Sequence, residues 1–155
     1  MTSTPSVRTC FWYPQNLGSA LQRYTQIFGE NFQVANPGLR LGDNSLMDAD
    51  FSIFGHQLRG MAFPGGAELN YSSSLVISVD GQAEVDYYWD SLLADGGRES
   101  QCGWLYDAFG LAWQIVPKQL MECLSNPDPI AAQYAMQAML GMKKIVISEL
   151  VKEAK

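Results

Sequence analysis

The hydrophobic and polar positions along the first half of the chain predict a strand, a helix and then a hairpin. Residues 6–13 alternate, with Thr9, Phe11 and Tyr13 on one face and Cys10 and Trp12 on the other, as in a β-strand. Apolar positions then recur at helical spacing until a glycine ends the pattern. The predicted elements are a strand over residues 6–13, a helix over 17–28 and a short strand over 32–35. A hairpin follows, with strands over 51–54 and 57–63 joined at residues 55–56.

The second half repeats this order. A strand over residues 74–79 precedes a helix over 82–94, and a hairpin follows at 103–106 and 111–116, where Pro117 stops the second strand. Such a duplication predicts an α+β fold of paired βαβββ modules that form one curved, half-open sheet with helices outside. We expect a single domain over residues 1–155, with modules at about 6–63 and 72–117 and a helical extension at 118–155. Helices are predicted in this extension at three places: residues 118–124, 130–140 and 145–153.

Two polar side chains in the second hairpin have more than one interpretation. Gln114 is a single polar residue among small apolar neighbours on one strand face, which indicates either a lined cavity or a hydrogen-bonded core amide. Asp107 lies in the connection between the strands, and it is either a pocket acid or a turn residue that binds its own backbone. The sequence leaves both pairs of alternatives open.

Composition and charge exclude several classes of function. The 155 residues are 47% hydrophobic and 17% charged, and the net charge is −6 with basic residues scattered. We therefore expect a globular, cytoplasmic protein whose main partner is neither nucleic acid nor a membrane. Three widely spaced cysteines indicate no disulfide framework or zinc site. The single histidine, His56, lies in a predicted turn, so a cysteine nucleophile paired with a positioned base is not expected.

Several motifs together resemble a known family. They are Gln101-Cys102-Gly103-Trp104-Leu105, Asp107, Phe109-Gly110, Trp113-Gln114-Ile115-Val116-Pro117, Glu84-Val85-Asp86, Tyr88-Trp89-Asp90, Met136-Gln137-Ala138-Met139-Leu140 and Met142-Lys143-Lys144-Ile145. With these motifs the chain resembles the PhnB-like branch of the vicinal oxygen chelate superfamily, which includes glyoxalase I, bleomycin-resistance proteins and extradiol dioxygenases. The resemblance implies the paired βαβββ fold and a homodimer. Some members are labelled demethylubiquinone methyltransferases. Methyl transfer from S-adenosylmethionine normally needs a glycine-rich loop between a strand and a helix, and this sequence has no such motif.

The resemblance also locates the family's metal-ligand positions. In this chain they fall at Thr9, at Ser74, at Gln114 and within residues 61–63. Neutral hydroxyl and amide oxygens are poor replacements for imidazole and carboxylate, so we expect no metal and no other cofactor.

Without a metal, the residues at these positions and their neighbours have the composition of a small-molecule pocket, which is mostly apolar with a few polar groups. The predicted pocket residues are Thr9, Phe11, Tyr13, Phe63, Ser74, Val76, Gln114 and Val116. We expect a small, largely apolar ligand, with no catalytic residue assigned. The alternatives are a metal-dependent lyase, isomerase or dioxygenase, a drug-sequestering resistance-type protein, or residues that only fill the core of the sheet.

Overall fold

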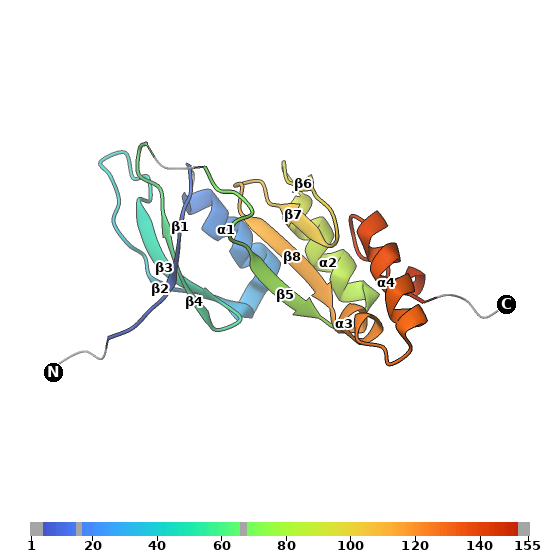
Figure 1. The fold of residues 1–155 in the computed structure, drawn as a ribbon. Helices are drawn as coiled ribbons and strands as arrows, with labels where there is room; N and C mark the ends of the chain where they lie inside the picture. The colour runs from blue at the N-terminus through green and yellow to red at the C-terminus, as the bar shows by residue number, and fades with distance from the viewer. Residues whose placement is uncertain (1–4, 15–16, 66–67, 152–155) are drawn as a thin grey trace. The chain divides into compact units, whose positions relative to one another are not determined.

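The structure is a computed structural model, and it describes residues 5–14, 17–65 and 68–151 of the chain. It contains two compact units, Met1–Leu69 (unit 1) and Asn70–Lys155 (unit 2). Each unit holds a four-stranded mixed sheet and a helix in βαβββ order, and unit 2 also carries the C-terminal helices (Figure 1). The predicted α+β class and the duplicated βαβββ module are therefore confirmed.

Unit 1 has one parallel and two antiparallel strand pairs, in the order β1-β4-β3-β2. Its elements are β1 (Thr9–Trp12), α1 (Leu17–Phe28), a 3-10 turn (Gly29–Asn31), β2 (Phe32–Asn36), β3 (Asp48–Ile53) and β4 (His56–Met61). Strand β3 begins at Asp48, three residues before the strand predicted over residues 51–54. The pattern missed these residues because Asp48 and Asp50 are charged and half-buried, which is unusual in a strand.

Helix α1 covers one face of this sheet with aromatic side chains. Tyr24 is fully buried, and its ring centroid lies 6.3 Å from that of Phe32 and 6.4 Å from that of Phe51. The hydroxyl groups of Tyr13 and Tyr24 are hydrogen-bonded at 3.2 Å. The face of β1 that carries Phe11 and Tyr13 is therefore the face beneath the helix, and it forms the core of unit 1.

The β3–β4 hairpin turns one residue earlier than the sequence predicts. Ile53 pairs with His56, so the two loop residues are Phe54 and Gly55, with φ angles of 49° and 77°. Two successive residues with positive φ match the twist of the flanking strands, which is why such turns close two-residue hairpins. The predicted loop at residues 55–56 was wrong by one position because the glycine takes the second place in the loop.

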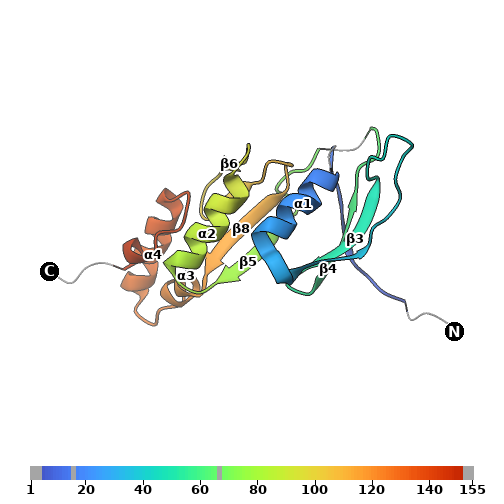
Figure 2. The same ribbon diagram turned by 180° about the vertical axis from the view of Figure 1, so that it is seen from behind.

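Unit 2 repeats the topology with the strand order β5-β8-β7-β6. Its elements are β5 (Leu75–Val79), α2 (Gln82–Leu93), β6 (Arg98–Glu99), β7 (Trp104–Tyr106), β8 (Ala112–Pro117), α3 (Lys118–Leu124), α4 (Pro129–Gly141) and a 3-10 turn (Ile147–Glu149). Helix α2 lies against one face of this sheet, behind it in Figure 1 and in front of it in Figure 2. The predicted hairpin is confirmed, and Trp104 pairs with Gln114 across it.

The C-terminal segment folds back onto its own unit. Met142, Ile145 and Leu150 form a buried cluster with Leu120 of α3. The predicted helix over residues 145–153 was wrong, because only Ile147–Glu149 form a 3-10 turn and the backbone before it is extended. Residues 152 and 153 lie outside the described part of the chain. None of the described helices is long and apolar enough to cross a membrane.

Candidate functional site

The sheet of unit 2 has one face under α2 and a second face that no helix of its module covers. Alternation along the strands places Ile77, Leu105 and Ile115 in the core beneath α2. The other face, called here the open face of unit 2, carries the alternate positions: Ser74, Val76, Ser78, Trp104, Tyr106, Ala112, Gln114 and Val116. Four of these residues belong to the pocket predicted from the sequence, and the structure brings all four onto this face.

A neutral polar pair lies on this face among apolar side chains. The Gln114 Nε2 amide donates to the Ser74 hydroxyl oxygen at 2.8 Å, and both side chains are half-buried. In the strand register Val76 and Trp104 flank Gln114 on either side. The Val76 side chain is apolar, and the residue is 55% exposed. The pair therefore offers amide and hydroxyl groups to a ligand beside uncovered apolar surface.

An aromatic cluster borders the polar pair. The ring centroids of Tyr71 and Tyr106 are 5.2 Å apart, and the Arg98 guanidinium carbon lies 4.0 Å from the centroid of the Tyr106 ring. Burial raises the pKa of Tyr106, and a hydrogen bond with Tyr71 raises it further, although Arg98 acts in the opposite direction. The phenol therefore stays neutral near pH 7. Within the cluster the Tyr106 ring is buried, with the Arg98 cation stacked on it, and Tyr71, which is 59% exposed, presents aromatic surface.

The corresponding face of unit 1 is charged. Register places Cys10, Arg59 and Asp50 in one row across β1, β4 and β3, and the matching row in unit 2 is Val76, Gln114 and Trp104. Arg59 thus occupies in unit 1 the place that Gln114 has in unit 2. Its guanidinium forms ion pairs with Asp48 and, at 3.3 Å, with Asp50.

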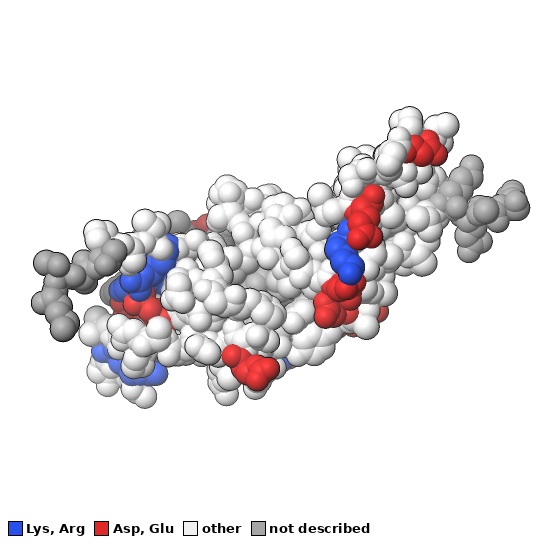
Figure 3. All heavy atoms as spheres, turned by 90° about the horizontal axis from the view of Figure 1, so that it is seen from below, with Lys and Arg blue, Asp and Glu red and all other residues white. Residues whose placement is uncertain are grey.

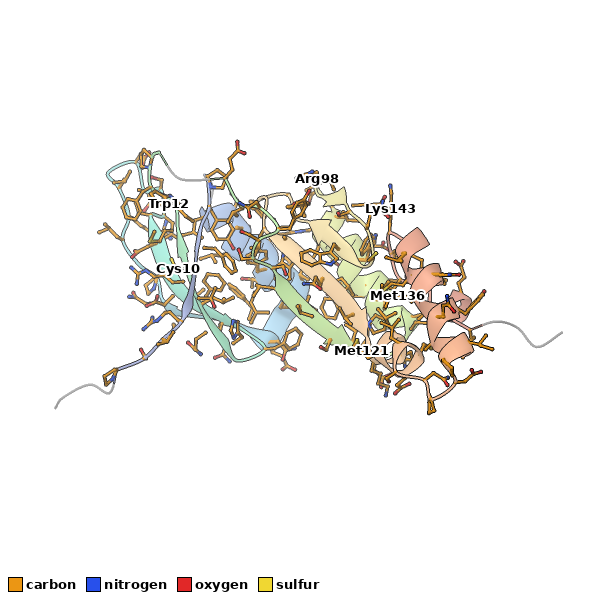
Figure 4. All side chains as sticks on the ribbon, viewed as in Figure 1. Cys10, Trp12, Arg98, Met121, Met136 and Lys143 are labelled. Atoms are coloured by element: carbon orange, nitrogen blue, oxygen red, sulfur yellow. The ribbon has the colours of Figure 1, made fainter. Side chains whose placement is uncertain are left out.

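Arg8 completes this ion network. Its Nη1 lies 2.7 Å from the second carboxylate oxygen of Asp50. The charges of the two guanidinium groups and the two carboxylates therefore cancel within the network. Its ion pairs connect β3 and β4 with the residue that precedes β1. Figure 4 shows Cys10 and Trp12 on β1.

The Cys10 thiol beside the network is not activated. Partial desolvation raises its pKa above the ordinary value; Arg59 lowers it, but the Asp50 and Asp48 carboxylates raise it again. A nucleophilic cysteine needs the opposite shift, since the thiolate is the reactive form.

The structure does not bring the other four predicted pocket residues onto an open face. Phe11 and Tyr13 are 4% and 0% exposed and lie beneath α1, so the open side of β1 carries Cys10 and Trp12 instead. Alternation had separated the two sets correctly, but it could not tell which set faces the helix. Thr9 is exposed at the start of β1. Phe63 follows β4 and lines a separate hollow of about 510 Å³ in unit 1.

A metal ion of the kind that the superfamily implies does not fit the residues present. At two implied ligand positions, Ser74 and Gln114 are neutral and are hydrogen-bonded to each other. The implied positions in unit 1, Thr9 and residues 61–63, carry neither imidazole nor carboxylate, and the nearby Asp48 and Asp50 carboxylates are ion-paired with Arg59. Within the part of the chain that the structure describes, no group of three His, Cys, Asp or Glu side chains could hold a metal ion.

Sequence reasoning missed the charged face of unit 1 and the aromatic cluster of unit 2. A usable signal existed for the first, because Asp48 and Asp50 are two residues apart and therefore share one face of a strand. Arg59 lies on the adjacent predicted strand, but only the register shows that it meets them. No pattern along the chain connects Tyr71 with Tyr106.

Comparison with solved structures shows the same fold in several bacterial proteins. The PhnB protein of Bacillus cereus superposes with a TM-score of 0.61 at 18% identity, covering 73% of this chain and 99% of its own. A protein of Pseudomonas aeruginosa gives 0.58 at 18% identity, covering 74% and 98%. The fosfomycin resistance protein FosX of Listeria monocytogenes, solved with Mn(II) and sulfate, gives 0.53 at 20% identity, covering 74% and 92%.

Comparison of the sequence itself gives the family. No curated protein matches it. A family model matches residues 5–116, which include both βαβββ modules up to strand β8. The predicted resemblance is therefore confirmed: the fold is that of the PhnB and FosX structures, and the chain belongs to the family described as 3-demethylubiquinone-9 3-methyltransferase.

Proposed function

We infer that this PhnB-like protein binds a small, largely apolar molecule on the open face of unit 2. Ser74 and Gln114 would supply hydrogen bonds, and Val76 would contact the apolar part of the ligand beside Val116, which packs partly against the Leu120 cluster. The observation that carries the proposal is the hydrogen-bonded Ser74–Gln114 pair beside Val76, which is 55% exposed. A few polar groups within apolar surface are typical of small-molecule sites.

The chemistry of the face favours a ligand with an aromatic body and a neutral polar group. Tyr71, which is 59% exposed, and the half-buried Trp104 offer ring surfaces for stacking, which adds about 0.5–1.5 kcal/mol per aromatic contact. The amide and the hydroxyl can both donate and accept, so they suit a carbonyl or hydroxyl group of the ligand. A multiply charged ligand fits less well, because the centre of the face carries no charge to neutralise it.

The fold does not support the methyltransferase activity that the family's description names. Enzymes that bind nucleotide-like cofactors commonly do so at the carboxyl ends of strands in a large, mostly parallel sheet. Each described sheet here has four strands and one parallel pair. The proposal is therefore for binding, with no reaction assigned.

Fluorescence titration with Prodan tests the proposal, because this probe is a neutral aromatic ketone whose emission shifts to the blue in apolar sites. We expect saturable binding to the full chain. Val76→Asp should weaken it by about tenfold, because a carboxylate on the face must be desolvated when the probe binds. Gln114→Leu should weaken binding by about fivefold through loss of one hydrogen bond.

Val34→Asp is the matched control, since Val34 is 47% exposed on β2 in unit 1. It should bind Prodan as the unmodified chain does. The proposal fails if the probe does not bind, or if Val34→Asp and Val76→Asp weaken binding equally.

A further inference from the structure

Unit 1 has a hollow of its own, with a volume of about 510 Å³. It is lined by the start of α1, by the loop between β2 and β3 and by the residues that follow β4. Phe63, which the sequence assigns to the predicted pocket, lies here and away from the other predicted residues of that pocket. The volume is within the usual range of small-molecule sites, about 300–1,000 Å³. We call this cavity the unit 1 hollow.

Backbone hydrogen bonds hold the loop wall of the unit 1 hollow in place. The Leu41 N–H group donates to the Ser45 carbonyl at 3.0 Å, and the Met47 N–H group donates to the Leu39 carbonyl at 2.8 Å. The Met47 carbonyl accepts from the Ala62 N–H group at 2.8 Å, which joins the loop to the segment after β4. The hollow is therefore formed by the chain itself, and a ligand would not have to order these segments when it binds.

The interior of the unit 1 hollow is largely apolar. Its most buried lining residues are Leu17, Leu46 and Met47, which are 1%, 8% and 4% exposed. Leu41 and Phe63 also line it and are 48% and 36% exposed. Covering such side chains with the apolar body of a ligand would contribute about 25 cal/mol for each Å² removed from water.

One cation lies at this apolar surface. Among the described residues that line the hollow, Arg40 is the single charged one. Its Nη1 donates to the Asn44 carbonyl at 2.9 Å, and within the described chain its guanidinium has no carboxylate partner. The Asp43 carboxylate is close in sequence but accepts from the Ser45 N–H group at 3.0 Å and from the Ser45 hydroxyl at 2.6 Å. The Nε and Nη2 groups of Arg40 therefore remain available to a ligand.

Basic side chains elsewhere in the chain are mostly paired with carboxylates. Those with an ion-pair partner among the described residues are Arg8, Arg59, Lys118, Lys143 and Lys144. In Figure 3 most of the basic side chains on the visible face lie next to acidic ones. The chain has a net charge of −6, so an arginine that meets no carboxylate is an exception. Such a guanidinium beside an apolar hollow favours an anionic group on the ligand.

We propose that the unit 1 hollow binds a small organic acid with an apolar body. The two carboxylate oxygens would accept parallel hydrogen bonds from Nε and Nη2 of Arg40, a geometry that the planar guanidinium favours. The apolar body would lie against Leu41 and Phe63. A polyanion fits less well, because one guanidinium supplies one positive charge. This inference does not rest on the function proposed for unit 2, whose ligand is neutral.

Fluorescence titration of the full chain with anilinonaphthalene sulfonate tests the proposal, because this probe joins one anionic group to an aromatic body and brightens in apolar sites. We expect saturable binding. Octanoate should displace the probe, and octanol, which has the same chain length without the charge, should need about tenfold higher concentrations. Arg40→Gln should weaken binding of the probe by about tenfold and should remove the difference between octanoate and octanol.

Gly18→Leu is a second variant, which narrows the hollow without changing its charge. A Cβ atom at Gly18 would lie 3.9 Å from the Leu46 Cβ on the opposite wall, which is an ordinary contact. Leucine also favours helices over glycine, so circular dichroism should show an intact α1. We expect the new side chain to weaken binding of the sulfonate probe by about tenfold or more.

Arg23→Gln is the matched control, because it removes one positive charge from α1 at a residue that does not line the hollow. It should leave the dissociation constant of the sulfonate probe within about twofold of the original. The proposal is overturned if the probe does not bind, if Arg40→Gln weakens its binding no more than Arg23→Gln does, or if octanol displaces it as well as octanoate. Prodan binding should be unchanged in Arg40→Gln, and an equal loss for both probes would indicate one shared site and also overturn the proposal.

Discussion

At the scale of single residues, Asp107 determines how the second hairpin closes. One of its carboxylate oxygens accepts hydrogen bonds from the backbone N–H groups of Phe109 and Leu111, and the other accepts from the Trp113 indole at 2.9 Å. Asp107 is 5% exposed and Trp113 is 1% exposed. The turn interpretation of Asp107 is therefore confirmed, and the same side chain satisfies an indole that would otherwise be buried without an acceptor.

We predict that Asp107→Asn lowers the free energy of unfolding by about 1–3 kcal/mol. The asparagine can still accept from the turn, but its amide group then faces the Trp113 indole, and two donors cannot pair. Urea denaturation measures the loss. Asp128→Asn is the control: Asp128 caps α4 by accepting from the Ile130 N–H group, and asparagine caps helices equally well. Equal stability of the two variants would contradict this role of Asp107.

At the scale of elements, Gln82 attaches the C-terminal segment to the start of α2. Its amide nitrogen donates to the Ile145 carbonyl at 3.0 Å, and its carbonyl oxygen accepts from the Ile147 N–H group at 2.9 Å. The backbone N–H groups of Cys102 and Gly103 donate to the carbonyls of Met142 and Lys143. These contacts hold an extended segment in place of the helix that its apolar spacing indicates.

We predict that Gln82→Ala frees this segment. The substitution leaves two partly buried backbone groups without partners, which should cost about 1–3 kcal/mol of unfolding free energy. Hydrogen exchange of the Ile147 amide should become markedly faster, because the segment can open without unfolding the sheet.

Gln26→Ala on α1 is the control for Gln82→Ala, because the Gln26 side chain is exposed and accepts a hydrogen bond from the neighbouring Arg23 of the same helix. It should leave both the stability and the exchange of Ile147 unchanged. Unaltered exchange in Gln82→Ala would show that the buried side chains hold the segment without the glutamine.

At the scale of the whole molecule, ion pairs make stability depend on pH. Lys144 lies 2.9 Å from Asp86 and 3.5 Å from Asp90, which connects the C-terminal segment to α2. A hydrogen bond from Lys144, and then one from Gln82, holds the pKa of Asp86 below its ordinary value of 3.8. The pair therefore stabilises the fold fully above about pH 4, and this stabilisation is lost as the pH falls through the lowered pKa.

We predict that Asp86→Asn removes this contribution and leaves the Gln82 hydrogen bond, since asparagine still has an acceptor. Because the Asp86 side chain is 46% exposed, the loss at pH 7 should be below about 1 kcal/mol. Urea denaturation from pH 7 to about pH 2 should show the difference from the unmodified chain shrinking as the solution becomes more acidic. If the difference in unfolding free energy between Asp86→Asn and the unmodified chain grew with acidity, the Asp86–Lys144 ion pair would not be its source.

The sequence by itself determined the local structure and the duplicated module. Strand alternation, helical spacing and turn residues depend on neighbours along the chain, so they gave α1, the second hairpin and the start of α4 after Asp128 and Pro129. The repeated order of predicted elements, together with the family motifs, gave the duplicated βαβββ fold. The hydroxyl and amide of Ser74 and Gln114 could also be placed on one face, because both lie on strongly patterned strands.

Only the tertiary structure decided which face of each strand meets a helix. Alternation divides a strand into two sets of residues, but packing selects the buried one, and in β1 it selected Phe11 and Tyr13 over Cys10 and Trp12. Strand register brought Arg59 to Asp48 and Asp50, and Gln82 bound a segment far along the chain. These contacts join residues distant in sequence, and their free energy overrides local preference, as in the extended backbone before Ile147.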